Sequence, residues 1–315
     1  AVLNGLVLVT FIKQKLEVYF IENKSDADKL VDQVLANKRS RESAEKQRVN
    51  LKKKLMGNME LGGKVKKFVD CRSREISERE LYIVEGDSAL GSCKQGRDAS
   101  FQAIIPVRGK ILNCLKADYE SIFKSEIITD LIKVLGCGIE IQTKHNRDLS
   151  AFDFDSFRWN KIVICTDADV DGFQIRTLIL TMIYRLVPTL IEKGKVYIAE
   201  SPLFEITITR KSKDRKGNEE TTLFAYNEKE KADILRENKG SKISIQRSKG
   251  LGENEPEMMW ITTMNPASRR LIQVMPEDAS KTSLIFDMLL GDDLAARKQH
   301  IEEFGYLYLQ DLDLD

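Results

Sequence analysis

An apolar run that ends in a row of acidic residues constrains this chain more than any other stretch. Residues 162–165 read Ile-Val-Ile-Cys, and Asp167, Asp169 and Asp171 follow at alternate positions before a long apolar pattern. A short apolar run of this kind predicts a buried strand, and the pattern behind it predicts a helix over about 171–192. In an extended segment residues i and i+2 point the same way, so Asp167 and Asp169 can converge on one point.

The spacing of these carboxylates indicates a bound cation. Unpaired carboxylates close together raise one another's pKa, and a hard cation between them removes that cost. Mg²⁺ is the usual cation where paired carboxylates face a phosphate. A calcium EF-hand competes with this interpretation, but its twelfth position needs a bidentate acid and is Leu178 here, and no helix precedes the loop. A solvated acidic turn without chemistry is the commoner alternative, and the rest of the chain has to decide.

The composition is that of a globular protein without a strong overall charge. The chain has 315 residues, 42% hydrophobic and 31% charged, with a net charge of +1. This length allows two or three domains of about 100–200 residues, and any nucleic-acid-binding surface must be local. No apolar run approaches the roughly 18 residues of a membrane span. The start lacks an initiator Met and a signal-peptide pattern, so we expect a fragment of a longer chain.

The five cysteines do not form a metal-binding motif. They stand well apart without a C-x-x-C pair, and the chain has only two histidines, His145 and His300. Zinc sites need clustered Cys or His ligands, which argues against zinc. An odd cysteine count without a secretory signal favours reduced, mostly buried thiols in the cytoplasm.

The chain begins with an apolar stretch and a basic helix. Residues 6–21 alternate or run apolar, and we expect them to be the closing strands of an upstream domain that ends at residue 21. Residues 22–79 are expected to be a linker, in which a capping box at 25–28 opens a helix over about 26–55. Residues 38–54 are strongly basic, which indicates either a solvated helix face or contact with DNA phosphates.

Strands and helices then alternate, which predicts an α/β domain over residues 80–200 with a mainly parallel sheet flanked by helices. A buried strand at 81–84 ends on Glu85, ahead of a glycine turn and a helix pattern. Active sites of α/β sheets lie at such carboxyl ends. Further strands are expected at 101–107 and 195–200.

Residues 201–315 are expected to form a mostly helical tail domain that carries a β-hairpin. The hairpin is predicted at 207–226, a polar helix at 227–238 and a strand at 243–245. The remaining pattern looks helical, and three prolines mark expected helix starts: Pro256, Pro266 and Pro276.

Glu85 at one strand end and the acidic row at another can form a cluster that holds one or two Mg²⁺ ions. This arrangement suits phosphoryl transfer at a phosphodiester. Lys110 and Asn113 could reach DNA phosphates, which makes nucleic acid the expected substrate. Ile111 follows Lys110 where a Walker A motif needs Ser or Thr, so we expect no nucleotide-binding site here.

Six motifs occur in one order along the chain: E-G-D-S-A (85–89), K-Q-G-R (94–97), R-G-K-I-L-N (108–113), T-D-A-D-V-D-G (166–172), I-R-T-L (175–178) and K-G-L-G-E (249–253). With T-T-M-x-P (262–266) and G-D-D (291–293), they resemble the C-terminal half of the B subunits of bacterial type IIA topoisomerases, gyrase or topoisomerase IV. That half carries a Toprim domain. The resemblance runs from about residue 25 to the C-terminus.

The resemblance implies roles for individual residues. Glu85 and Asp167 resemble the ligands of a catalytic Mg²⁺, with Glu85 also a general acid or base. Asp167 and Asp169 resemble the ligands of a second metal, with Asp171 in support, and Mn²⁺ or Ca²⁺ can substitute. The implied DNA-binding residues are Arg97, Arg108, Lys110, Asn113, Gln174 and Lys249. The implied inhibitor-site residues are Asp87, Arg97 and Arg108.

The resemblance also implies a reaction and partners. It implies an ATP-dependent type II topoisomerase that cleaves and religates double-stranded DNA through a tyrosine of the partner A subunit, in an A2B2 heterotetramer. The outcome would be negative supercoiling or decatenation. ATP would bind in an upstream domain outside this chain. A cytoplasmic, nucleoid-associated bacterial protein without membrane contact is expected.

Two other readings remain open: another Toprim enzyme, such as a primase or an OLD-type nuclease, and a non-catalytic DNA-binding module. The sequence also departs from the family pattern at several positions. Leu90 replaces a glycine that would permit close backbone approach. Phe173 and Gln174 replace a small residue and a histidine, Ser248 replaces a tyrosine, and residues 254–255 replace Met-Asn. We expect a working cleavage site with an altered response to metals or inhibitors.

Overall fold

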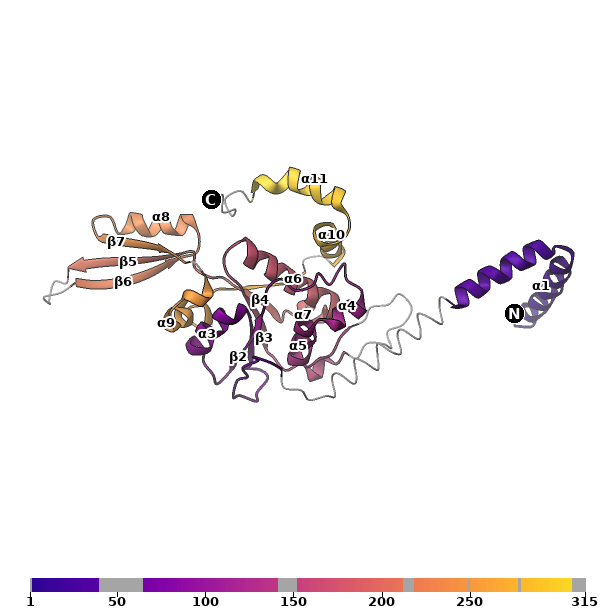
Figure 1. Ribbon diagram of the computed structural model, residues 1–315, viewed down its shortest axis with the longest axis horizontal. Helices are drawn as coiled ribbons and strands as arrows, with labels where there is room; N and C mark the ends of the chain where they lie inside the picture. The colour runs from indigo at the N-terminus through magenta and orange to yellow at the C-terminus, as the bar shows by residue number, and fades with distance from the viewer. Residues whose placement is uncertain are drawn as a thin grey trace. The chain divides into compact units, whose positions relative to one another are not determined.

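The computed structural model describes residues 2–39, 65–140, 152–211, 218–248, 250–276 and 279–307 (Figure 1). The chain divides into two compact units, Ala1–Leu61 and Gly62–Asp315. Among the described residues, no helix combines the length and the apolar character that crossing a membrane requires.

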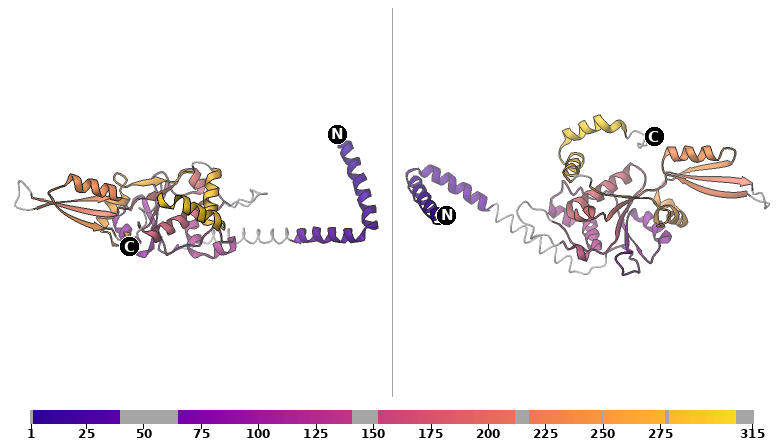
Figure 2. Two further views of the ribbon diagram at one scale, coloured as in Figure 1. Left: turned by 90° about the horizontal axis from the view of Figure 1, so that it is seen from above. Right: turned by 180° about the vertical axis from the view of Figure 1, so that it is seen from behind.

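The described part of the first unit is helical. Helix α1 (Val2–Glu22) is followed by a second helix over residues 24–39, and the chain bends between the two (Figure 2). The side chain of Asn23 donates a hydrogen bond of 3.0 Å to the carbonyl of Tyr19 at this bend. The helix expected over 26–55 is therefore confirmed as far as residue 39, and the basic stretch beyond it lies outside the described residues.

The strands expected at residues 6–21 are wrong, because α1 spans them. The two apolar runs are separated by residues 10–15, Thr-Phe-Ile-Lys-Gln-Lys, which contain no glycine, proline or asparagine to make a turn. A short apolar run cannot be assigned to strand or helix from its periodicity alone. Without a turn between the runs, one continuous helix satisfies the backbone hydrogen bonds of both.

The second unit is built on a five-stranded sheet in the order β2-β1-β3-β4-β8. The first four strands are parallel, and β8 is antiparallel to β4. The mainly parallel sheet predicted from the sequence is thereby confirmed. The strands are β1 (Glu80–Glu85), β2 (Gln102–Val107), β3 (Lys161–Cys165), β4 (Val196–Ala199) and β8 (Leu271–Gln273).

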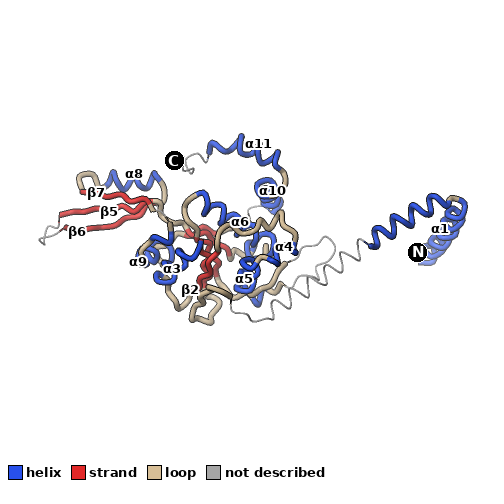
Figure 3. Tube along the Cα trace, viewed as in Figure 1, coloured by secondary structure: helices blue, strands red, loops and turns tan. Residues whose placement is uncertain are grey.

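Helices cover both faces of this sheet (Figure 3). On one face, Tyr82 and Val84 pack in a cluster with Cys93 of α3 (Gly86–Gly96) and Met259 of α9 (Pro256–Met259). On the other face, alternate residues of the same strands are equally buried, among them Leu81, Ile83, Ile162 and Ile164. Burial on both faces explains why these strands read as continuous apolar runs.

The connections between the strands are α4 (Tyr119–Lys124), α5 (Glu126–Leu135), η1 (Phe154–Ser156), α6 (Val170–Leu186) and α7 (Thr189–Glu192). The single helix expected over 171–192 is in fact divided into α6 and α7. Val187 takes a non-helical φ of −148°, and Pro188 follows it. A proline disfavours the helical conformation of the residue before it, so the break lies at this position.

A separate antiparallel sheet follows, in the order β6-β5-β7 (Figure 1). Strands β5 (Phe204–Lys211) and β6 (Asn218–Ala225) form the predicted hairpin, and β7 (Lys242–Arg247) pairs with the other edge of β5. Helix α8 (Glu228–Glu237) contacts β6. Ile206 and Ile208 are buried in the small core of this sheet.

The last part of the chain is mainly helical, as predicted, with η2 (Leu251–Glu253), the π-helical turn η3 (Trp260–Met264), α10 (Ala279–Leu290) and α11 (Leu294–Phe304). Pro256 begins α9 as expected, but Pro266 lies in a turn. Strand β8 was not expected. It has three residues, too few for a periodic pattern, and it forms because β4 offers a free edge.

A buried ion pair joins this last part of the chain to β1. Arg269 Nη2 donates a hydrogen bond of 2.6 Å to Glu80 Oε1, and Arg269 Nη1 donates to Glu80 Oε2 and to the hydroxyl of Tyr82. The Glu80 and Arg269 side chains are only 4% and 5% exposed. Burial opposes ionisation of Glu80, but hydrogen bonds and charge from Arg269 outweigh it and lower the pKa of this carboxyl.

All five cysteines are free thiols, and four of them are buried. Burial raises the pKa of Cys93 to about 12 and that of Cys165 well above its ordinary value. Thiolate is the reactive form, so these two side chains behave as core residues rather than nucleophiles.

Candidate metal centre

The acidic residues lie where the strand order reverses. The chain passes from β1 to β2 on one side, and β3 pairs with the other side of β1. Val84 is paired with Cys165, so Glu85 and the loop after β3 lie at the same carboxyl edge. Open α/β sheets bind ligands in the crevice at such a reversal.

Glu85 and Asp167 are brought together at this edge. The backbone N–H of Asp167 donates a hydrogen bond of 3.2 Å to Glu85 Oε2. Partial burial raises the pKa of Glu85, and the carboxylates of Asp167, Asp169 and Asp171 raise it further. The site therefore concentrates negative charge that a cation would stabilise.

Asp167 is held from the opposite side by the K-G-L-G-E segment. The backbone N–H of Leu251 donates a hydrogen bond of 2.8 Å to Asp167 Oδ1. Burial nevertheless raises the pKa of Asp167, and the charges of Asp169 and Glu253 act in the same direction. Gly250 approaches so closely that a Cβ on it would lie 3.0 Å from Asp167 Oδ2.

The other two aspartates of the acidic row have hydrogen-bond or ion-pair partners of their own. Asp169 is the N-cap of α6 and accepts a hydrogen bond of 2.7 Å from the N–H of Gly172. Asp171 forms a 2.8 Å ion pair with Lys110 Nζ, and both side chains are largely exposed. Within the described residues, no group of three or more His, Cys, Asp or Glu side chains is arranged to hold a metal ion.

The donors nevertheless fit Mg²⁺. This ion is commonly held by only one or two carboxylates and fills its other positions with water and substrate phosphate. Glu85 and Asp167 provide two partly buried carboxylates with raised pKa values, at a substrate-binding edge of the sheet. Both facts suit a hard cation better than a structural site closed by protein ligands.

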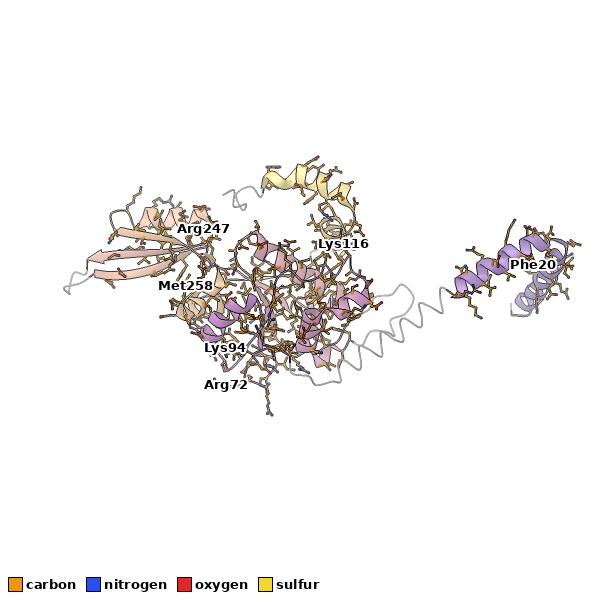
Figure 4. All side chains as sticks on the ribbon, viewed as in Figure 1. Phe20, Arg72, Lys94, Lys116, Arg247 and Met258 are labelled. Carbon is orange, nitrogen blue, oxygen red and sulfur yellow. The ribbon has the colours of Figure 1, made fainter. Side chains whose placement is uncertain are left out.

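A hollow of about 240 Å³ opens beside Asp167. It lies between the loop after β3, the start of β5 and the end of β7, where Arg247 is labelled in Figure 4. The hydroxyl of Ser201 is buried and has no hydrogen-bond partner among the described residues. The residues that line the hollow are Asp167, Ala168, Asp169, Ser201, Pro202, Leu203, Arg247, Ser248, Gly250 and Leu251.

The R-G-K turn after β2 faces the acidic first turns of α3 and α6. Arg108 Nε lies 3.5 Å from Asp87 Oδ1, and Lys67 also forms an ion pair with Asp87. The hydrogen bond from Lys67 and the charge of Arg108 hold the pKa of Asp87 below its ordinary value. Gly109 has a φ of +67°, which strains a residue with a side chain, so this turn favours glycine.

Arg97 and Asn113 are placed differently from the other DNA-binding candidates. Arg97 Nη1 donates to three backbone carbonyls, those of Val69, Asp70 and Gln102. Asn113 donates a 2.9 Å hydrogen bond to the carbonyl of Leu290 in α10 and accepts one from the N–H of Leu115. Both side chains therefore hold the fold together as they stand.

The remaining candidates are exposed or not described. Gln174 is exposed on α6, and Lys249 lies outside the described residues. Phe173 beside Gln174 is 38% exposed and stacks with the guanidinium of Arg176 at 4.8 Å from the ring centroid. Leu90, which replaces the family glycine, packs against the buried cluster beneath α3.

Two participants were not anticipated from the sequence. Lys67, whose ammonium pairs with Asp87, lies in a loop with no motif around it. The N–H of Leu251 is a backbone group and carries no residue-type signal. The glycines on either side of Leu251 are a signal in retrospect, because glycine permits close backbone approach: a Cβ on Gly252 would lie 2.5 Å from Ser88 Cβ.

Comparison with known proteins identifies two matching families. Residues 80–201 match the Toprim domain, and residues 240–302 match the carboxyl terminus of the DNA gyrase B subunit. Among similar proteins, the DNA gyrase B subunit of Clostridium acetobutylicum is 42% identical over 300 residues, which cover 94% of this chain and 44% of that protein.

The same subunit of Thermotoga maritima is 40% identical over 304 residues, 96% of this chain and 44% of its own length. That of Halalkalibacterium halodurans is 44% identical over 297 residues, 94% of this chain and 43% of its own length. The chain thus spans less than half the length of these relatives. With the Toprim match on the parallel sheet and the gyrase B match behind it, the chain belongs to the family of type IIA topoisomerase B subunits and corresponds to their Toprim-containing C-terminal half.

Proposed function

We propose that this chain is the core of the B subunit of an ATP-dependent type II DNA topoisomerase. In this proposal it supplies the Mg²⁺-binding carboxylates for reversible cleavage of double-stranded DNA, and a tyrosine of the partner A subunit attacks the phosphodiester. ATP binding belongs to a region outside this chain. The assembly of the two kinds of subunit is an A2B2 heterotetramer in the bacterial cytoplasm, associated with the nucleoid.

One observation carries the proposal: Glu85 and Asp167 meet at the carboxyl edge of neighbouring parallel strands. The 3.2 Å hydrogen bond between them joins the ends of β1 and β3. Their raised pKa values support a cation between them, since a cation relieves the repulsion of close carboxylates. Asp169 and Asp171 supply further negative charge around that position.

We assign roles to the chain's own residues as follows. Glu85 and Asp167 hold the catalytic Mg²⁺, and Asp167 with Asp169 holds a second ion, with Asp171 in support. When bound, the metal stabilises negative charge on the leaving 3′-oxygen. We also assign Glu85 the role of general acid or base, because it lies at the carboxyl edge of the sheet beside Asp167. Arg108, Lys110, Gln174 and Lys249 contact the DNA backbone.

A cleavage assay tests the proposal. The full-length protein is combined with its partner A subunit, supercoiled plasmid and Mg²⁺, and linear DNA that is covalently attached to protein is measured after denaturation. We expect cleavage by the parent protein, and a loss of at least about 100-fold in Glu85→Ala and Asp167→Asn, the scale seen when a catalytic acid or base is removed. Glu228→Gln, which changes an exposed carboxylate on α8, is the matched control.

Two outcomes would contradict the proposal. If Glu85→Ala and Asp167→Asn cut DNA as well as Glu228→Gln does, the carboxylates are not the catalytic site. If the parent protein binds DNA but never cuts it, whichever divalent cation is supplied, the chain is a non-catalytic DNA-binding module. If the parent protein does cut DNA, its products with ATP distinguish the two activities: supercoiled plasmid indicates supercoiling, and separated circles indicate decatenation.

A further inference from the structure

We infer that the backbone N–H of Leu251 and the adjoining glycines Gly250 and Gly252 position Asp167 for its metal, so that residues 250–252 are a positioning element of the centre. This inference rests on the proposed function. It assigns to a segment of the gyrase B tail a direct part in the geometry of a carboxylate that belongs to the Toprim sheet.

Asp167 has two carboxylate oxygens with different surroundings. Oδ1 accepts the 2.8 Å hydrogen bond from Leu251, which fixes the rotation of the carboxylate. Oδ2 faces Gly250, where even a single Cβ would lie 3.0 Å away. The hydrogen bond at one oxygen orients the carboxylate, and the missing Cβ of Gly250 leaves the other oxygen room, which is the condition for a preorganised ligand.

The segment that makes these contacts is itself fixed against α3. A Cβ on Gly252 would lie 2.5 Å from Ser88 Cβ, and Ser92 Oγ donates a 3.1 Å hydrogen bond to the carbonyl of Gly252. Leu251 is buried in the same cluster as Cys93 and Met259. Residues 250–252 therefore fix the position of Asp167 relative to α3, the helix that begins directly after Glu85.

The segment also connects the metal centre to the three-stranded sheet. Strand β7 ends at Arg247, three residues before Gly250, and the N–H of Ser248 donates a 2.9 Å hydrogen bond to the carbonyl of Leu203 at the start of β5. Residues 250–252 thus follow the three-stranded sheet closely in the sequence.

Two pairs of variants test the inference. Gly250→Ala places a methyl group against Asp167 Oδ2, and Gly91→Ala is its control, since a Cβ on Gly91 meets nothing within 4 Å. Leu251→Pro removes the N–H, and Leu251→Ala removes the same side chain but keeps the N–H. Gly250 has φ −179° and ψ 157°, and Leu251 begins η2, so a proline fits the backbone at this position.

The readout is Mg²⁺ affinity measured by calorimetry on the full-length protein without DNA, with a thermal melt of each variant to confirm folding. We expect Gly250→Ala to bind Mg²⁺ about 10- to 100-fold more weakly than Gly91→Ala, and Leu251→Pro to show the same deficit relative to Leu251→Ala, the usual cost of losing a partner of a metal ligand. A second readout needs no metal: Asp167→Ala should accelerate hydrogen exchange at the Leu251 amide.

The outcomes separate this inference from the proposed function. If the parent binds Mg²⁺ through Asp167 but both variants bind as tightly as their controls, the positioning role is wrong and the proposed function stands. If hydrogen exchange at Leu251 is unaffected by Asp167→Ala, the hydrogen bond itself is refuted. If the parent shows no Mg²⁺ binding that depends on Asp167, the proposed metal centre is wrong, and this inference is overturned with it.

Discussion

Arg269 offers the sharpest stability prediction, because its neighbour in sequence is a matched control. Arg269 pairs with Glu80 in β1, where both side chains are about 5% exposed or less, and it also donates to the hydroxyl of Tyr82. Arg270 pairs with Glu230 at 2.8 Å, but those side chains are 45% and 32% exposed. The two ion pairs differ in burial and in hydrogen bonding, since Arg269 donates to both oxygens of Glu80 and Arg270 to only one of Glu230.

Removing one partner of a buried pair leaves an uncompensated charge. Arg269→Met should lower the free energy of unfolding by about 3 kcal/mol, the lower end of the usual range for such a loss. The lower end applies because Lys161 Nζ remains 3.3 Å from Glu80 Oε1. Arg270→Met should cost no more than about 1 kcal/mol, as exposed pairs do. Adding Glu80→Gln to Arg269→Met should restore most of the loss.

Urea unfolding followed by tryptophan fluorescence measures these values, since Trp159 and Trp260 both lie in the unit Gly62–Asp315. The folded pKa of Glu80 is lowered, so the pair contributes stability above the unfolded pKa of this carboxyl, and that contribution disappears as the pH falls through the folded pKa. The difference between parent and Arg269→Met should therefore shrink in acid. Equal losses for the two arginine variants, or a difference independent of pH, would refute the reasoning.

Arg97→Ala should lower the free energy of unfolding by about 2 kcal/mol, because the guanidinium donates to three backbone carbonyls. Urea unfolding measures this loss, and a loss of DNA binding with unchanged stability would contradict the prediction. Leu90→Gly, which restores the family residue, should lower the free energy of unfolding by at least about 1 kcal/mol, because glycine is a poor helix former. Urea unfolding measures this loss. A gain in stability would mean that Leu90 is strained. The pKa values of Glu85 and Asp167 are raised in the folded protein, so without divalent cations the stability should fall as the pH rises from the unfolded pKa of each carboxyl through its folded pKa. Thermal melts at several pH values measure this fall, and Asp167→Asn should make it smaller. An unchanged dependence of stability on pH in Asp167→Asn would contradict the assignment.

Much of the second unit follows from sequence patterns. Residues 162–165 and 81–84 are apolar without interruption because both faces of the sheet are covered, and this made them recognisable as parallel strands. The break at Pro188 was also readable in principle, since the residue before a proline avoids helix. Residues 6–21 were misassigned because their apolar runs fit a strand or a helix equally well.

The site was only partly predictable. The positions of Glu85 and Asp167 at two strand ends were visible in the sequence, and their adjacency follows from the pairing of β1 with β3. The argument that Asp167 and Asp169 converge ignored capping, so it missed the hydrogen bond from the N–H of Gly172 to Asp169 Oδ1. Both aspartates nevertheless line the same hollow. The roles of the Leu251 N–H and of Lys67 depend on tertiary contacts that no local pattern encodes.

Arg97 and Asn113 show why a residue type does not determine a role. Both residue types can contact phosphates, but here both side chains donate hydrogen bonds to backbone carbonyls within the fold. Contact of Arg97 and Asn113 with DNA stays a prediction from the family resemblance. The ion pair of Lys110 with Asp171 is exposed, so it costs little to exchange for a phosphate.

The central claim is that the carboxylates of Glu85 and Asp167 hold a divalent cation together. Electron paramagnetic resonance of Mn²⁺ tests it directly, because the signal of the hydrated ion decreases as the ion binds to protein. We predict that the parent protein removes Mn²⁺ from solution and that Glu85→Gln and Asp167→Asn each weaken this by about 10-fold or more, whereas Glu228→Gln does not. Equal Mn²⁺ binding by all four proteins would contradict the claim.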